Sequence, residues 1–228
     1  MIKFFRHIRQ NLLMENKTGK YFKYAIGEIV LVVIGILIAL QINTWNESRK
    51  QAISENEFIA SVKKDLKQDK AFVNFIIDQI EPRIEAYKAL SIDLPNRYDN
   101  DRRSLDSLFQ EYFVSQRTFY PISGSYESAV SGNQINTFRN KDLLQDVVKI
   151  YNSTYDRLID NGKIIDERWF FISKKYSYER RTGQFRDMKP EQLSEFLDDL
   201  YFHYAQMEWY LEMLNEAIVE IDNITAEN

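Results

Sequence analysis

Two histidines, His7 and His203, are the residues of this sequence best suited to metal binding or proton transfer. A predicted membrane span lies between them, so they cannot share one metal site. His203 has Asp199 one helical turn before it and Met207 one turn after it. We expect a hydrogen bond between His203 and Asp199 on one helix face, because a metal or proton-relay role would need partners from other helices.

Motifs for enzymatic chemistry are absent: the sequence has no phosphate-binding loop, dinucleotide fingerprint, HExxH or nucleophile elbow. Four serines between residues 123 and 131 lie near Gly124 and Gly132. The nearest histidine is 72 residues beyond Ser131, so turn and capping roles explain these serines better than a catalytic triad does. The chain has no cysteine, which excludes disulfides, thiolate metal sites and cysteine nucleophiles. We expect no catalytic activity, no metal and no cofactor.

Glu28 is the only acidic or basic side chain between Tyr24 and Trp45. Ionisable groups inside a membrane are candidates for function by default, so Glu28 could titrate or bind a partner. The alternative is a carboxylate near the inner interface that reaches the headgroups or pairs with Lys23 or Lys20. The interfacial interpretation is preferred, and the functional one stays open.

The stretch from Tyr24 to Trp45, YAIGEIVLVVIGILIALQINTW, is predicted to be a membrane-spanning helix. Its residues would cover about 33 Å at 1.5 Å per residue, enough for a hydrocarbon core of about 30 Å. Aromatic rings at both ends suit the headgroup level. Gly27, Gly35 and Ala39 are small, and the spacing of Gly35 and Ala39 would let two such helices pack closely.

Charge predicts the orientation of this span. Residues 1–23 carry six lysines and arginines against one glutamate, so the positive-inside rule places them in the cytoplasm. Residues 1–14 are predicted to form an amphipathic helix on the inner leaflet, with Gly19 as the break before the span. A cleaved signal peptide is the alternative, which the long basic segment and Glu28 disfavour. The expected domains are residues 1–23 in the cytoplasm, 24–45 in the membrane and 46–228 outside it.

The segment from Arg9 to Glu47, RQNLLMENKTGKYFKYAIGEIVLVVIGILIALQINTWNE, resembles the N-terminal signature of a domain-of-unknown-function family of small Bacteroidota membrane proteins. The resemblance is specific over these residues and looser afterwards. It implies a Gram-negative inner-membrane protein with a periplasmic helical region. The family has no established activity, so the resemblance supplies no catalytic residues.

The first helix outside the membrane is predicted to continue directly from the span, because the 46 residues between Gly35 and Pro82 contain no glycine or proline. A hinge in the polar residues 46–57 is the alternative. We expect Pro82 to kink this helix, which would end near Ser91. An apolar stripe with heptad-like spacing marks its buried face: Ile59, Val62, Leu66, Val73, Ile76 and Ile80.

Asp69 occupies the position at which this stripe skips an apolar residue. One expectation is burial against an arginine such as Arg157 or Arg168, where the pair would fix the register of the helices. The other is exposure through a gradual drift of the stripe around the helix. The sequence favours neither.

The middle of the chain contains prolines and glycines that interrupt long helices, so short elements are predicted there. These are a loop over residues 91–104, a helix over 104–115 capped by Ser104, a turn over 119–125, a short helix over 126–132 ending at Gly132, and an N-cap at Asn140.

Two further long helices show alternating spacings of four and three residues, over more than four heptads in the first. The seam of the first consists of Leu144, Val148, Tyr151, Tyr155, Leu158, Gly162, Ile165, Trp169, Ile172 and Tyr176. The seam of the second consists of Leu193, Leu197, Leu200, Tyr204, Met207, Leu211, Leu214, Ile218 and Ile221. This periodicity predicts an all-α fold, in which one transmembrane helix continues into an elongated antiparallel bundle of three long helices plus short ones.

Aromatic residues are concentrated in both of these helices. Trp169, Phe170, Tyr201 and Tyr204 could line a ligand pocket, although packing in the core is the preferred interpretation. Phe171, Phe202 and Trp209 lie off the apolar seams and are candidates for a partner-binding surface.

Charge also limits the function. Residues 1–45 have a net charge of +4 and residues 46–228 a net charge of −8, and an acidic domain disfavours nucleic-acid binding. The preferred hypothesis is a structural or protein-interaction module of the cell envelope, bound to the bilayer and to itself or to another envelope protein. The alternatives are a small-ligand sensor that signals through a membrane partner, and an accessory subunit of an energised membrane complex that uses Glu28.

Overall fold

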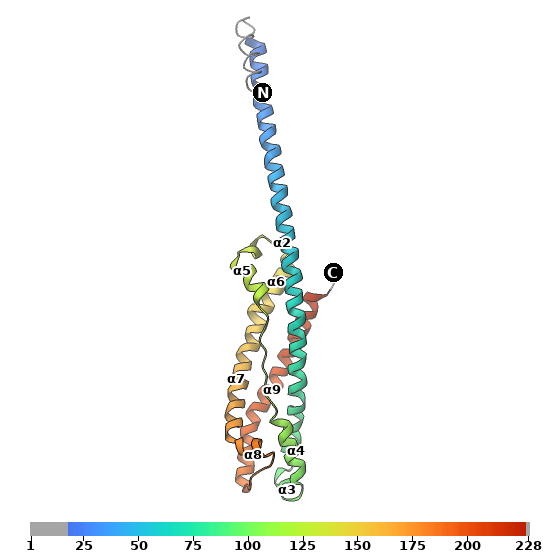
Figure 1. Cartoon of the computed structure of the whole chain (residues 1–228), viewed down its shortest axis with the longest axis vertical. Coiled ribbons are helices and arrows are strands. Elements are labelled where there is room, and N and C mark those ends of the chain that lie inside the picture. Colours follow the sequence, from blue (N-terminus) through green and yellow to red (C-terminus); the bar gives the residue numbers. More distant parts are fainter. Residues whose placement is uncertain (1–17, 227–228) are drawn as a thin grey trace. The chain divides into compact units, whose positions relative to one another are not determined.

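The computed structural model describes residues 18–226, and these residues are mostly helical with no β-strand among them (Figure 1). They divide into two compact units, residues 18–54 and residues 55–226. The predicted amphipathic helix over residues 1–14 and His7 lie outside the described residues. The elements are α2 (Thr18–Ser91), α3 (Leu94–Asn100), α4 (Arg102–Tyr112), α5 (Gly124–Ser131), the 3-10 helix η1 (Gln134–Thr137), α6 (Lys141–Lys149), the π-helix η2 (Ile150–Thr154), α7 (Tyr155–Lys175), α8 (Ser177–Thr182) and α9 (Pro190–Thr225).

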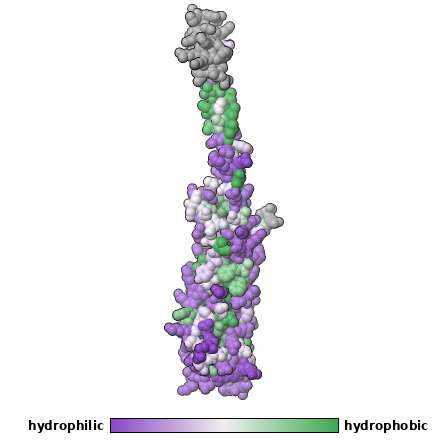
Figure 2. All heavy atoms as spheres, viewed as in Figure 1, coloured by the Kyte–Doolittle hydropathy of each residue, from purple (hydrophilic) through white to green (hydrophobic). Residues whose placement is uncertain are grey.

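Helix α2 provides the first unit. The described part of α2 starts at Thr18, so Gly19 is helical, and the break predicted before the span borders on residues outside the described range. The large apolar side chains from Phe22 to Trp45 are exposed and form an apolar band in Figure 2. Within the described part of the chain, this is the one helix with the length and apolar composition needed to cross a membrane.

Residues 46–57 are helical throughout, so α2 contains no break at the predicted hinge. The helix also continues through Pro82 and ends at Ser91, where the sequence placed its end. The residues of its predicted stripe are buried, except for Ile59, which is partly buried against the same core. The heptad-like spacing therefore identified the buried face of this helix correctly.

The second unit is built on three long segments: residues 55–91 of α2, and helices α7 and α9. Ion pairs show that α9 runs antiparallel to both of the others. Lys70 and Lys88 of α2 pair with Asp222 and Glu208 of α9, in reverse order along the chain. Arg157 and Lys175 of α7 pair in the same reversed way with Glu216 and Glu195. For α7 and α9 this is the antiparallel direction expected of helices joined by a short connection.

An extended segment of residues 113–123, called the strap below, runs along these helices between α4 and α5 (Figure 1). The sequence predicted the end of a helix up to residue 115 and a turn over residues 119–125, so both predictions are corrected. Pro121 explains part of the difference, because a proline disfavours helical backbone at the residue before it and has no N–H to donate.

The predicted loop over residues 91–104 is mostly helical. Pro95 lies in the first turn of α3, where a proline is well tolerated. Helix α4 begins at Arg102, and Ser104 does not cap it; the Ser104 hydroxyl instead accepts a hydrogen bond from Arg97 at 2.9 Å. The predictions for the next elements are confirmed. Helix α5 ends next to Gly132, and the Asn140 side chain caps α6 by accepting the Leu143 N–H.

The π-helix η2 displaces the predicted seam of the second long helix. Val147 before η2 and Ile150 at its start are buried, whereas the predicted Leu144 and Val148 are only partly buried. From Tyr155 onwards the predicted seam positions face the core. A π-helical turn accommodates one extra residue, so it shifts the buried face by one position while the helix continues.

Candidate functional site

Residues of the three long helices hold the strap in place. An extended segment outside a sheet has backbone groups that need partners elsewhere. Arg83 of α2 has an exposed fraction of 1%, and it donates hydrogen bonds to the Val114 carbonyl at 2.9 Å, to the Ser115 carbonyl and to the Gln116 side chain. Burial lowers the pKa of Arg83 to about 10, which leaves the guanidinium charged at neutral pH.

The centre of the strap lies against α7 and α9. Thr118 donates a hydrogen bond to Asp166 at 2.8 Å, and the Phe119 N–H donates to the Tyr210 hydroxyl at 3.0 Å. Gly162 allows this close approach, because a Cβ atom there would lie 3.1 Å from Cβ of Thr118. The single glycine in the predicted seam of α7 is therefore the position at which the strap crosses that helix.

Asp69 holds the end of the strap. Its exposed fraction is 1%, and its Oδ1 atom accepts the Ile122 N–H at 2.9 Å. Tyr151 of η2 donates to the carbonyl of the same Ile122 at 3.1 Å. The expectation of an exposed Asp69 is thus wrong, and so is the expectation of an arginine partner. Arg157 pairs with Glu216 instead, and Arg168 lies over the Phe202 ring.

His203 is buried, and its Nδ1 atom lies 2.8 Å from the Tyr112 hydroxyl. Burial, helped by the charge of Arg83, lowers the pKa of His203 to about 3, so the ring is neutral at physiological pH. The predicted bond to Asp199 is wrong. Asp199 accepts a hydrogen bond from Tyr176 and pairs with Lys175, because it faces α7 whereas His203 faces the core.

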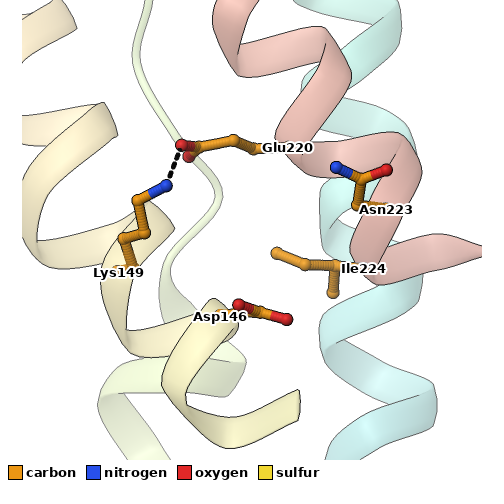
Figure 3. Close-up of a pocket in the computed structure, with 5 residues that line it drawn as sticks. All are labelled: Asp146, Lys149, Glu220, Asn223 and Ile224. Atoms are coloured by element: carbon orange, nitrogen blue, oxygen red, sulfur yellow. Dashed lines mark hydrogen bonds and ion pairs between the residues drawn. The ribbon is translucent and has the colours of Figure 1, made fainter. Parts of the chain in front are cut away.

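A cavity of about 100 Å³ lies between α6 and α9 (Figure 3). Lys149 forms an ion pair with Glu220 at 2.5 Å, and Thr154 donates to the other oxygen of the same carboxylate at 2.6 Å. Burial alone would raise the pKa of Glu220, but these two partners lower it below its usual value. Asp146 and Asn223 complete the polar lining, and the space is sufficient for a few water molecules.

The aromatic strip, defined as Phe171, Phe202 and Trp209, lies on the outside of the second unit. The exposed fractions of these side chains are 49%, 41% and 52%. The guanidinium of Arg168 lies 4.1 Å from the Phe202 ring centroid and so joins the outer faces of α7 and α9. Trp209 follows Phe202 by seven residues, two turns along the same face of α9.

The four aromatic residues proposed to line a pocket divide into two pairs. Trp169 and Tyr204 are partly buried against the core, in agreement with the preferred interpretation. Phe170 and Tyr201 are largely exposed, so that interpretation is wrong for them. Periodicity alone could not reveal this, because both residues lie directly beside a seam position in the sequence.

A family model matches residues 28–190 of the chain, and its description is "Family of unknown function (DUF6090)". The chain belongs to this family. The result agrees with the predicted resemblance to an uncharacterised family. No curated protein and no solved structure matches the chain. The function of this DUF6090 protein must therefore be argued from its own residues.

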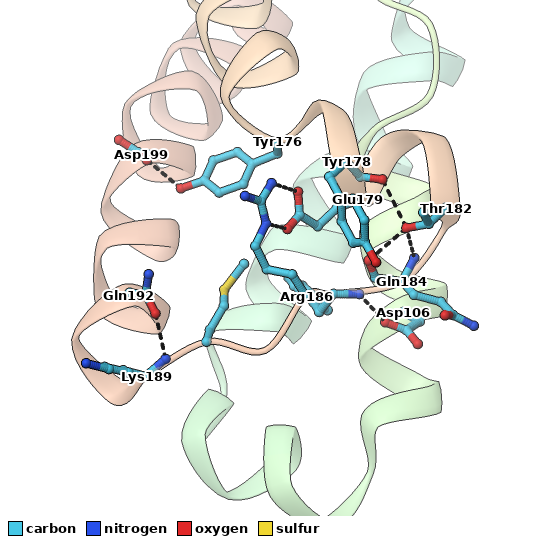
Figure 4. Close-up of polar contacts among 12 residues, drawn as sticks. Asp106, Tyr176, Tyr178, Glu179, Thr182, Gln184, Arg186, Lys189, Gln192 and Asp199 are labelled. Carbon is cyan, nitrogen blue, oxygen red and sulfur yellow. Dashed lines mark hydrogen bonds and ion pairs between the residues drawn. The ribbon is translucent and has the colours of Figure 1, made fainter.

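Ion pairs and hydrogen bonds close one end of the DUF6090 bundle (Figure 4). Glu179 of α8 is fully buried and is held by two hydrogen bonds from Arg186, in the loop before α9. Burial alone would raise the pKa of Glu179, but Arg186 lowers it below its usual value. The same loop is held by Asp106, which accepts the Phe185 N–H at 3.0 Å. These contacts fix the loop between α8 and α9 to α8 and to α4.

The residues proposed to act in the membrane lie on α2 in the first unit. Gly27 and Gly35 are exposed, and a Cβ atom built on either would meet nothing within 4 Å. Ala39 is also exposed and lies one turn after Gly35. Glu28 is half-exposed and lies seven residues before Gly35, which places both on the same side of the helix. Their roles in helix packing or proton chemistry stay predictions.

Metal binding finds no support in the described residues. Within residues 18–226, no group of three or more histidine, aspartate or glutamate side chains could hold a metal ion.

The sequence patterns did not identify Arg83, Tyr112 and Tyr210 as functional candidates. Two features of the sequence could have marked Arg83 as a buried residue. It lies next to the predicted buried stripe, and no acidic residue three or four positions before it could pair with it on the helix surface.

Proposed function

We propose that this DUF6090 protein is a single-pass inner-membrane protein that acts as a non-catalytic protein-interaction module in the periplasm. Residues 24–45 would cross the membrane, with the basic N-terminal segment in the cytoplasm. The bundle of residues 55–226 would then present its surface to another protein of the envelope. The apolar α2 segment and the opposite net charges on its two sides support this topology.

The aromatic strip is the observation that carries the proposal. Tryptophan, tyrosine and arginine are the residue types that most often dominate binding energy at protein interfaces. Trp209 and Arg168 belong to these types, and Phe171 and Phe202 add apolar area beside them. Large rings that face solvent cost solubility, and binding a partner would remove them from water.

The partner is expected to be a different protein with basic residues around an apolar centre. Residues 46–228 carry a net charge of −8, so two copies of the bundle repel each other at low ionic strength. A basic rim on the partner would instead attract the bundle and speed its association. Association of two copies through the aromatic strip is the competing arrangement.

Replacing the strip residues should abolish partner capture. We expect the variant F171S/F202S/W209S to lose the crosslinked species that the wild-type chain forms in native membranes, because the replaced rings supply the apolar contact area. Crosslinking followed by affinity purification and mass spectrometry measures this loss. The matched control is F75S, which removes a ring with an exposed fraction of 47% from α2.

Three outcomes decide between the arrangements. Loss of a crosslinked heterologous protein in the triple variant, but not in F75S, supports the proposal. Capture of a second copy of the chain through the strip would replace the heterologous partner with self-association. Equal capture by the wild-type chain and the triple variant would exclude the strip as the interface.

Labelling of single cysteines tests the topology, and the absence of natural cysteines makes each introduced thiol unique. We expect D187C to react with a membrane-impermeant maleimide in cells whose outer membrane has been permeabilised. G19C should react only after the inner membrane is disrupted. The Asp187 side chain is fully exposed, so poor access within the fold would not explain a negative result. The reverse pattern would contradict the proposed orientation.

A further inference from the structure

Asp69 is a buried carboxyl group with a hydrogen bond to only one of its two oxygens. Its Oδ1 atom accepts the Ile122 N–H, whereas its Oδ2 atom has no hydrogen-bond partner. The Tyr155 hydroxyl is also buried and has no hydrogen bond of ordinary geometry, but its interaction with Asp69 lowers the pKa of that carboxyl. A buried polar atom without a partner calls for an explanation in terms of a proton, a water molecule or a function.

The charges around Asp69 are unfavourable to its ionised form. Asp65 lies one turn earlier on α2 and adds a negative charge. Helix η2 and α7 contribute the neutral phenols of Tyr151 and Tyr155, and the strap contributes only the Ile122 N–H. On α9, Glu220 acts on Tyr155 and is already bound to Lys149 and Thr154. Within residues 18–226, no salt bridge joins Asp69 to a lysine or arginine.

We propose that Asp69 is a proton-controlled latch: its protonated form holds the end of the strap on the bundle, and its ionised form lets this segment open to water. The neutral carboxyl can accept from Ile122 and donate its own proton to the Tyr155 hydroxyl. The ionised carboxylate is a buried charge without a cation, so any opening that admits water relieves its desolvation. This inference is independent of the aromatic strip.

The direction of the pH effect follows from linkage. Burial, with a smaller contribution from Asp65, raises the pKa of Asp69 from 3.8 to about 6, against the lowering effects of Ile122 and Tyr155. Opening returns the carboxyl to water and to its ordinary pKa. The closed strap therefore holds the proton more tightly, and this extra stability is complete below about pH 4. This stability is lost as the pH rises through about 6. Above that pH the opening equilibrium no longer changes with pH.

Hydrogen exchange of the Ile122 amide measures this opening in the full chain, reconstituted in lipid nanodiscs. After correction for the intrinsic effect of pH on exchange, the opening equilibrium at pH 7 should be about tenfold larger than at pH 5. Amides in the middle of α9 should show no such ratio, because they do not depend on the strap. Equal protection of Ile122 at both pH values would overturn the proposal.

Three variants separate the latch from a general effect of charge. D69N keeps an acceptor for Ile122 and gains a permanent donor toward Tyr155, so the strap should stay closed at both pH values. D65N removes the neighbouring charge and should move the midpoint to lower pH. D78N removes an exposed aspartate of the same helix and should change nothing. A pH response that survives in D69N would sink the idea.

A direct titration covers the case in which D69N fails to fold. NMR of the wild-type chain with isotope-labelled aspartate measures the carboxyl chemical shifts as the pH is changed. These shifts give the titration midpoint of each aspartate. A buried aspartate that titrates near pH 6 supports the latch. If every aspartate titrates below pH 4.5, the latch does not exist.

Discussion

Replacement of Arg83 by alanine is expected to lower the free energy of unfolding of the bundle by about 3 kcal/mol. The reason is that Arg83 satisfies the carbonyl groups of Val114 and Ser115, which the strap cannot pair by itself. The substitution also leaves a cavity beside Trp169, over whose ring the guanidinium lies at 4.9 Å. Urea unfolding in detergent, followed by tryptophan fluorescence, measures the change, and the melting temperature should fall by about 10 °C.

Burying a charge without a counter-ion is itself costly, so removing the Arg83 guanidinium also relieves a desolvation penalty. R83M would remove that cost while filling most of the volume. We expect R83M to be destabilised as well, since it leaves the same strap carbonyls without donors. R83K should be intermediate, because an ammonium cannot reproduce the planar fork of donors that rests on Trp169.

The control for Arg83 is R103A, which removes an exposed arginine from α4 and should change stability by less than about 0.5 kcal/mol. If R83A differs from R103A by less than about 1 kcal/mol, Arg83 does not hold the strap. In that case the strap would depend on the contacts of Thr118, Phe119 and Ile122 with the other helices.

The long helices could be predicted from the sequence because their signal is local and repeated. The end of α2 at Ser91 and the cap of α6 at Asn140 were both placed correctly from single residues and their neighbours. The burial of residues on the α7 seam from Tyr155 to Ile172 followed from spacing alone. Each of these features depends on residues a few positions apart, and the periodicity of 3.5 records such relations directly.

The strap could not be predicted because it depends on contacts between residues far apart in sequence. Arg83 meets the strap about 30 residues later, and Tyr210 meets Phe119 across 91 residues. A local sequence pattern contains no information about contacts between such distant residues. Asp69 shows the same limit: its position on the seam was noticed, but its partner is a backbone N–H that carries no sequence signal.

Deletion experiments should distinguish the π-helix η2 from the ordinary helix that follows it. Ser153 is an exposed residue of η2, and a π-turn contains one residue more than an α-turn needs. Deleting Ser153 should convert η2 into α-helix while the side chains on both sides keep their faces. We expect this variant to fold, with a loss of about 2 kcal/mol because the contacts of Lys149 and Thr154 with Glu220 are disturbed.

Deleting Glu167, which is equally exposed but lies within regular α7, should have a far larger effect. Every residue after it would rotate by about 100° around the helix, which would turn Ile172 out of the core and bring charged residues inward. This variant should fail to give a cooperative unfolding transition, whereas the Ser153 deletion keeps one. Circular dichroism during thermal unfolding compares the two. If the two deletions were equally damaging, η2 would not be acting as a one-residue insertion, and the displaced seam before Tyr155 would need another cause.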